Sequence, residues 1–151
     1  MWELNADPEV IKFTGNEPFE SVEAAKEFLR NYTHYCKWGY GRWAVVDKRR
    51  DLFIGWCGLK RNEEHWIDIG FRFFRNEWDK GFATEAAMAC LNYGFVDLRM
   101  DEIVGRSSIE NKASIRVLEK IGMEFWKTGH CDGIGECLYY RMRNPTSKFC
   151  L

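Results

Sequence analysis

Alternation of apolar and polar residues is the clearest pattern in the chain, and it predicts several β-strands. Residues 65–74 alternate strictly, which places every second side chain on the same face of a strand. Residues 42–60 read as two strands around a polar turn, residues 101–108 as a short strand, and residues 123–143 as a hairpin with a glycine-rich tip. In the 65–74 strand, one face carries Ile67, Ile69, Phe71 and Phe73, and the other carries Trp66, Asp68, Gly70, Arg72 and Phe74.

Three further segments show helical periodicity. Residues 21–35 begin at Ser21, a preferred N-cap residue, and repeat apolar positions along one stripe. Residues 81–97 carry a seam of small side chains that lets a helix lie close to a sheet, and residues 112–121 begin at Asn111 and stop at Gly122. The order of elements predicts one α/β (α+β) domain over residues 1–151, a mixed sheet with helices on both faces.

Composition and charge restrict the function classes. The chain has 151 residues and a net charge of −1, which argues against nucleic acid as the main partner. No apolar run approaches the roughly 20 residues that span a bilayer, and no signal-peptide pattern begins the chain. We therefore expect a cytoplasmic protein with no membrane partner.

The six cysteines are spaced irregularly, and Cys57 and Cys90 fall inside apolar segments, so we expect reduced thiols. His130, Cys131 and Cys137 have the right donor atoms for a metal, but no C-x-x-C pair accompanies them. We expect no metal site.

The stretch "RNEWDKGFATEA" (75–86) feeds a strand directly into a helix N-terminus. Free backbone N–H groups and the positive end of the helix dipole make such a turn an anion site. Gly81 removes a β-carbon that would hold a phosphate away, and Ala83 keeps the next turn slim. The alternative interpretation is an ordinary strand–helix connection in which the glycine serves only the tight turn.

Together, "EWDKGFATEA" and "NKASIRVLEKIGMEF" resemble the GNAT superfamily of N-acetyltransferases, in particular its ribosomal-protein N-terminal and spermidine acetyltransferase branch. "NADPEVIKFTG", "IGFRF" and "LYYRM" extend the resemblance over nearly the whole chain. It implies a sheet splayed open at its middle, with the co-substrate acetyl-CoA in the gap. It also implies pantetheine contacts from the backbone at Phe71 and from Asn111 and Ser114. The backbone N–H groups implied to hold the pyrophosphate are those near Asp79, Lys80, Gly81, Phe82 and Ala83.

Three departures from the family pattern stand out. Asp79 replaces a glycine, and we expect Lys80 and Arg75 to offset its charge. Leu118 stands where many members have a tyrosine that acts as general acid. The family's first edge strand is missing, so either the sheet is shorter or a neighbouring chain covers the edge, as in a homodimer.

The resemblance implies direct attack of a neutral amine on the acetyl thioester, with a general base to collect a proton and a backbone N–H near Phe71 to stabilise the oxyanion. Asp68 is the first candidate for the base, followed by Glu85 and then His65. Tyr139 and Tyr140 are candidates for the acid.

The acceptor stays open between a protein or peptide N-terminus, a polyamine and another small amine. The alternative function is a non-catalytic acyl-CoA-binding or protein-interaction module that retains the fold.

Overall fold

The computed structural model describes residues 1–145; Cys150 lies outside this range. The helices are α1 (Trp2–Ala6), α2 (Pro8–Ile11), α3 (Val22–Arg30), α4 (His34–Trp38), α5 (Phe82–Asn92) and α6 (Lys112–Lys120). Two shorter helical segments are η1 (Arg75–Glu77) and the π-helical turn η2 (Tyr93–Asp97), which directly extends α5. The strands are β1 (Arg42–Asp47), β2 (Leu52–Arg61), β3 (Ile67–Phe73), β4 (Glu102–Ser108), β5 (Glu124–Cys131) and β6 (Gly135–Arg143).

All six strands form one sheet in the order β1-β2-β3-β4-β6-β5. Each neighbouring pair is antiparallel except β3 and β4, which are parallel. These two strands pair only at Asp68 with Val104 and at Ile69 with Gly105. Beyond Ile69 and Gly105 the strands separate, whereas β2 stays paired with β3 to its end. The mixed, splayed sheet predicted from the sequence is thereby confirmed.

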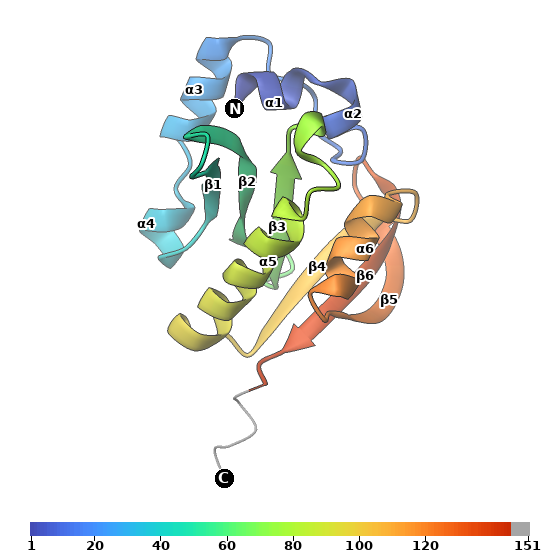
Figure 1. Cartoon of the computed structure of the whole chain (residues 1–151). Helices are drawn as coiled ribbons and strands as arrows, with labels where there is room; N and C mark the ends of the chain where they lie inside the picture. Colours follow the sequence, from blue (N-terminus) through green and yellow to red (C-terminus); the bar gives the residue numbers. More distant parts are fainter. Residues whose placement is uncertain (146–151) are drawn as a thin grey trace.

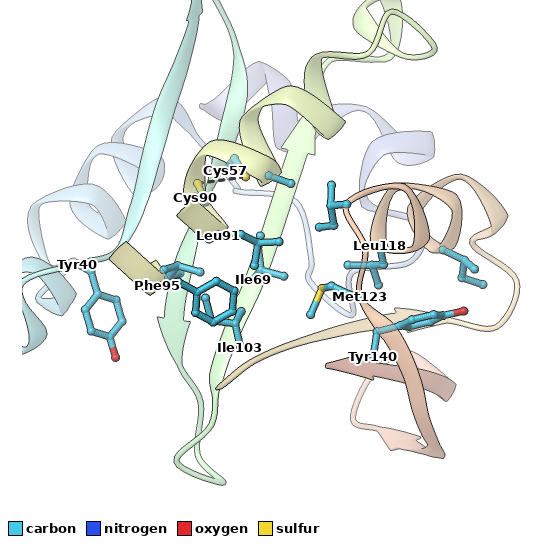
Figure 2. Packing of buried hydrophobic residues seen from close by; sticks show 14 residues of the cluster. Tyr40, Cys57, Ile69, Cys90, Leu91, Phe95, Ile103, Leu118, Met123 and Tyr140 are labelled. Carbon is cyan, nitrogen blue, oxygen red and sulfur yellow. Dashed lines mark hydrogen bonds between the residues drawn. The ribbon is translucent and has the colours of Figure 1, made fainter. Parts of the chain in front are cut away.

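Helices α5 and α6 cover one face of the sheet, in front of the strands in Figure 1. The main core lies between these helices and the sheet, as Figure 2 shows. Ile69 of β3 belongs to this core, which confirms the face assignment made from the alternation. The buried members of the core include Leu59, Ile69, Ala87, Leu91, Phe95, Ile103, Leu118 and Met123.

The small-residue seam of α5 and η2 sets how closely the helix approaches the sheet. Ala87 is fully buried, and Gly94 is buried against the strands. A β-carbon on Gly94 would lie 2.7 Å from Cδ1 of Ile103 and 3.0 Å from Cδ1 of Leu59. The helix axis can therefore lie this close only because position 94 carries no side chain.

The opposite face is covered at one end by α1 and α2, which pack on β2 through Leu4, Val10 and Trp56. Helices on both faces were predicted, but one detail was wrong. The single helix expected over residues 21–35 is broken into α3 and α4, because the chain leaves the helical path at Asn31–Thr33. Ser21 does cap α3, its Oγ accepting from the Ala24 N–H at 3.1 Å.

The edge of the sheet is β1, and the described residues that precede it form only helices α1–α4. The described chain thus lacks the additional edge strand that the resemblance led us to look for. Tyr32 and Tyr35 from α3–α4 hydrogen-bond the backbone of Arg42 at the start of β1. Part of this edge is therefore occupied by the chain's own side chains.

Candidate functional site

A cavity of about 520 Å³ opens where β3 and β4 diverge. It is bounded by the end of β3, the turn before α5, one side of α6 along its whole length and the segment around α2. Its lining includes most of the predicted cofactor contacts: Phe71, Asp79, Gly81, Phe82, Ala83, Asn111 and Ser114. Residues as far apart in the sequence as Glu9 and Lys120 thus meet around one opening. Lys80 is not among the lining residues.

The turn before α5 has an unusual backbone. Asp79 has φ +57° and Gly81, the N-cap residue, has φ +85°, so both are left-handed. A β-carbon on Gly81 would meet no atom within 4 Å, so the glycine is required by conformation and not by crowding within the protein. Aspartate tolerates this region better than most residues, which explains how it can stand at position 79.

No side chain caps the N-terminus of α5. The first N–H groups of a helix have no intrahelical partner, and together with the helix dipole they favour an anion. Because this helix end borders the cavity, its uncapped N–H groups are available to a negatively charged ligand.

Helix α6 presents its own N-terminus to the same cavity. The Oδ1 of Asn111 accepts from the Ser114 N–H at 3.1 Å, so the predicted capping role of Asn111 is confirmed. Asn111 and Ser114 also line the cavity, so capping and ligand contact are compatible.

Lys80 and Arg75, which we expect to offset the charge of Asp79, each form an ion pair with another carboxylate. Lys80 contacts Glu77, with 3.2 Å between Nζ and Oε2, and Arg75 lies 3.6 Å from Asp7. The Glu77 side chain is buried. Its two carboxylate oxygens also accept hydrogen bonds from Arg50 at 2.9 and 2.8 Å. These contacts lower the pKa of the Glu77 carboxyl, with the Arg50 hydrogen bonds as the main cause.

Part of the positive charge in the cavity comes from α6, which the sequence reasoning missed, and Arg72 of β3 lines the cavity as well. Lys112, Arg116 and Lys120 all line it. Their spacing of four residues is the signal that could have found them, because it places all three on one side of a helix. The acidic residues that line the cavity are Glu9, Glu77, Asp79 and Glu110.

Asp68 lies where β3 makes its last contacts with β4, on the face opposite α5 and α6. It is buried, and its Oδ2 accepts from Nη2 of Arg106 at 3.1 Å. Its Oδ1 is buried with no hydrogen-bond partner in the described chain. Burial raises the pKa of the Asp68 carboxyl above its usual range, although Arg106, Arg42 and Lys60 oppose that shift.

None of the catalytic candidates lines the cavity, and this includes Asp68. Glu85 is exposed in the first turn of α5 and does not line the cavity. Tyr139 is buried on β6, where its hydroxyl donates to the His130 carbonyl at 3.3 Å. Burial raises the pKa of Tyr139 to about 12, so it stays protonated. Leu118 is buried in the core.

The two remaining alternatives are also placed apart from the cavity. Tyr140 donates to Oε1 of Glu119 at 3.1 Å, on the α6 side of the sheet. His65 has φ +66° in the β2–β3 turn and borders a second hollow of about 320 Å³ beside α4. Of the predicted catalytic residues, only Asp68 combines burial, an unpartnered oxygen and a position at the strand separation.

Comparison with known proteins decides the family. The family model described as "Acetyltransferase (GNAT) domain" matches residues 1–124. The chain belongs to the GNAT acetyltransferase family. It is an acetyl-CoA-dependent N-acetyltransferase, which agrees with the splayed sheet and with the uncapped helix end beside its opening.

Individual relatives agree with this assignment. The uncharacterized protein YkkB of Bacillus subtilis is 36% identical over 81% of this chain and 72% of its own length. The uncharacterized N-acetyltransferase p20 of Bacillus licheniformis is 32% identical over 79% of this chain and 68% of its own.

Solved structures share the fold of this GNAT domain. A GNAT-family acetyltransferase from Bacillus anthracis has a TM-score of 0.80 and 27% identity, with 95% of this chain and 89% of that chain covered. Spermidine N-acetyltransferase from Vibrio cholerae, solved with CoA and spermine, has a TM-score of 0.78 and 19% identity, with 94% and 86% covered.

Residues 1–145 contain no helix long and apolar enough to cross a membrane. The same residues contain no group of three or more histidine, cysteine or acidic side chains arranged to hold a metal ion.

Proposed function

We propose that this GNAT enzyme binds acetyl-CoA in the 520 Å³ cavity and acetylates a small primary amine or a peptide N-terminus. The observation that carries the proposal is the separation of β3 from β4 beyond Ile69 and Gly105, directly beside an uncapped helix N-terminus. A splayed strand offers unpaired backbone groups to an amide-rich chain such as pantetheine, and the helix end offers N–H groups to a diphosphate.

Different residues around the cavity bind different parts of acetyl-CoA. The N–H groups around Gly81 hold the pyrophosphate, and the backbone of β3 near Phe71 holds the pantetheine. The cationic side chains of α6 supply charge for the remaining phosphate oxygens, since arginine and lysine both pair with phosphate. Asn111 and Ser114 line the same side. Bound in this way, acetyl-CoA supplies the activated acetyl thioester.

Asp68 is the general base of the proposed mechanism. The amine must be neutral when it attacks the thioester carbonyl, and Oδ1 of Asp68 is the carboxylate oxygen with no partner to occupy it. A raised pKa makes this carboxylate a stronger base than an exposed aspartate. Arg106 holds Oδ2 and so fixes the orientation of the carboxylate.

Backbone N–H groups of β3 near Phe71 stabilise the oxyanion that forms as the amine attacks. Donors fixed in this way need no reorganisation during the reaction, which is why their contribution to catalysis is large. The position of Phe71 in the cavity lining supports this role.

The proposal is tested by measuring CoA binding by calorimetry and acetyl transfer by release of free thiol. We expect CoA to bind the wild type and Asp68→Asn equally, and the variant to lose at least about 100-fold in kcat. Asp97→Asn, an exposed aspartate at the far end of η2, is the matched control. Equal activity of all three proteins would remove Asp68 from the mechanism, and failure to bind CoA would remove the proposed cavity.

A further inference from the structure

The sheet face opposite α5 and α6 carries an unusual concentration of positive charge. In the part around Trp56 and Asp68, strand pairing and contacts place five charged side chains, and four of these are cationic; the same register puts Glu102, Arg141 and Arg143 further along this face. We call the set of five the acceptor face. Its members are Arg42 of β1, Lys60 of β2, Asp68 and Arg72 of β3, and Arg106 of β4.

Most of these cations form no ion pair with a carboxylate among the residues that the structure describes. Of the ion pairs formed by residues 1–145, none includes Arg42, Lys60 or Arg72. Asp68 is already paired with Arg106, which also lies 4.0 Å from Glu64. Charged groups taken out of water are normally paired with an opposite charge. The cations of this face therefore lack an anionic partner.

The two arginines are built into the fold around Trp56. The guanidinium carbon of Arg42 lies 4.4 Å from the centre of that ring, and that of Arg72 lies 5.4 Å from it. Arg72 is buried and donates to Oδ1 of Asn5 and, at 3.1 Å, to Oδ1 of Asn16. Both partners are neutral and leave its charge uncompensated, and Arg72 also lines the 520 Å³ cavity.

Several polar atoms at this place are buried with no hydrogen-bond partner among residues 1–145. They are Nε of Arg42, Nε of Arg72, Nε1 of Trp56 and Oδ1 of Asp68. Three of them are donors on neighbouring side chains, so a ligand that satisfies them must present acceptor oxygens.

The arginine pair lies next to the point where the thioester is expected. A β-carbon on Gly70 would be 3.5 Å from Nη2 of Arg42 and 3.5 Å from Cζ3 of Trp56. Gly70 immediately follows Ile69, the last β3 residue that pairs with β4. The Arg42 side chain therefore reaches over β3 just beyond its last pairing with β4.

Burial lowers the pKa of Arg42 and brings that of Arg72 to about 10, with their mutual repulsion as a second cause for Arg72. The pKa of His34 beside them is lowered by burial, then by Lys60 and Arg42. A cationic acceptor would meet the same repulsion.

From this arrangement we infer that the acceptor is an amine that also carries a carboxylate, such as an amino acid or a peptide with an acidic residue beside its N-terminus. The carboxylate pairs with Arg42 and Arg72, and the amine faces Asp68. The inference rests on the proposed acetyl transfer and deepens it by naming the substrate class. A polyamine, the ligand in the Vibrio cholerae structure, brings several positive charges and no anion.

The same charges assist the chemistry. A positive surface lowers the pKa of an incoming ammonium group, so more of the amine is neutral and able to attack. The carboxylate of the acceptor offsets the repulsion that would otherwise prevent binding. A planar guanidinium fits a carboxylate through two parallel hydrogen bonds, which fixes the direction of the amine.

The test compares acceptors that differ only in the negative charge. Free L-amino acids are assayed against their α-amides, peptides with Asp at the second position against the same peptides with Asn, and spermidine against all of them. In one of the two pairs, amino acid against amide or Asp peptide against Asn peptide, we expect at least about tenfold higher kcat/KM for the member with the carboxylate. The pair that shows this difference also tells whether the acceptor is a free amino acid or a peptide. The amide has the less basic amine, so chemistry alone would favour the opposite order.

Arg42→Gln is the deciding variant. It should abolish the carboxylate preference and leave CoA affinity unchanged, whereas Arg49→Gln, an exposed arginine in the β1–β2 turn, should change neither. Equal or better use of amides or spermidine, or a preference that survives Arg42→Gln, would overturn the inference without touching acetyl transfer.

Binding distinguishes this inference from the transferase proposal. If CoA binds but no acceptor is acetylated, the proposed transfer fails. Calorimetric titration of the CoA-loaded protein with the same acceptors then decides the inference alone. Carboxylate-dependent binding that Arg42→Gln removes supports it, and its absence contradicts it.

Discussion

Asp79 is the residue whose charge opposes the proposed ligand, so removing that charge should tighten CoA binding. Asp79→Asn changes the charge alone, because asparagine keeps the shape of the side chain and tolerates the left-handed φ of +57°. Asp79→Gly removes the charge and the backbone strain together. A comparison of the two variants separates the electrostatic effect from the conformational one.

The structure sets the size of the effect. Two unit charges about 4 Å apart interact by about 1 kcal/mol in water and about 4 kcal/mol at an effective dielectric constant near 20. Asp79 is exposed, which favours the lower value, and Lys80 and Arg75 are engaged by Glu77 and Asp7. We therefore expect Asp79→Asn to tighten CoA binding by about five- to tenfold.

The assay is calorimetric titration with CoA at low ionic strength and again at about 1 M salt, where the Debye length falls to about 3 Å. The gain should shrink at high salt if it is electrostatic. Asp97→Asn serves again as the charge control. An unchanged or weaker affinity for Asp79→Asn at low salt would refute the reasoning, because it would mean that no phosphate lies beside the α5 turn.

Three further variants test separate parts of the structure. Gly81→Val should weaken CoA binding at least about tenfold, because a β-branched residue resists the φ of +85° that orients the N–H groups of the turn. Calorimetry measures the Kd, and a wild-type Kd for this variant would exclude the turn from the binding site. In the pH profile of kcat/KM, the wild-type activity should fall on the acidic side at a pH above the pKa of an ordinary aspartate, because activity needs the carboxylate of Asp68 and its pKa is raised. This acidic fall should disappear in Asp68→Asn. If it survives in the variant, it belongs to another group. Gly94→Ala should lower the free energy of unfolding by about 1–3 kcal/mol in urea titrations, because the added methyl would overlap Ile103 and Leu59; wild-type stability would show that α5 and η2 can move away from the sheet freely.

Local patterns in the sequence predicted the elements well. The alternation in β3, the Asn111 cap and the small residues of α5 each report a contact with near neighbours or with the sheet as a whole. The break between α3 and α4 escaped because Asn31, Tyr32 and Thr33 carry no proline or glycine to mark it. Helix propensity is low at Asn31, Tyr32 and Thr33, and the hydroxyls of Tyr32 and Tyr35 hydrogen-bond the Arg42 backbone at the start of β1.

The site was predicted only in part, for a physical reason. Backbone features such as the turn at Gly81 follow from local conformation and could be read from the sequence. Side-chain pairings across the fold could not: Asn5 and Arg72 are 67 residues apart, and Arg106 reaches Asp68 over 38. Likewise, Lys80 pairs with Glu77 because Glu77 is buried, and burial at that position depends on the tertiary fold.

The most direct measurement is a crystal structure of the chain with CoA bound. We expect the pyrophosphate on the N–H groups around Gly81 and the pantetheine between β3 and β4, with its sulfur near Ile69 and Gly105. CoA bound at any other place, or β3 and β4 paired along their full length with no room for pantetheine, would contradict the proposed site.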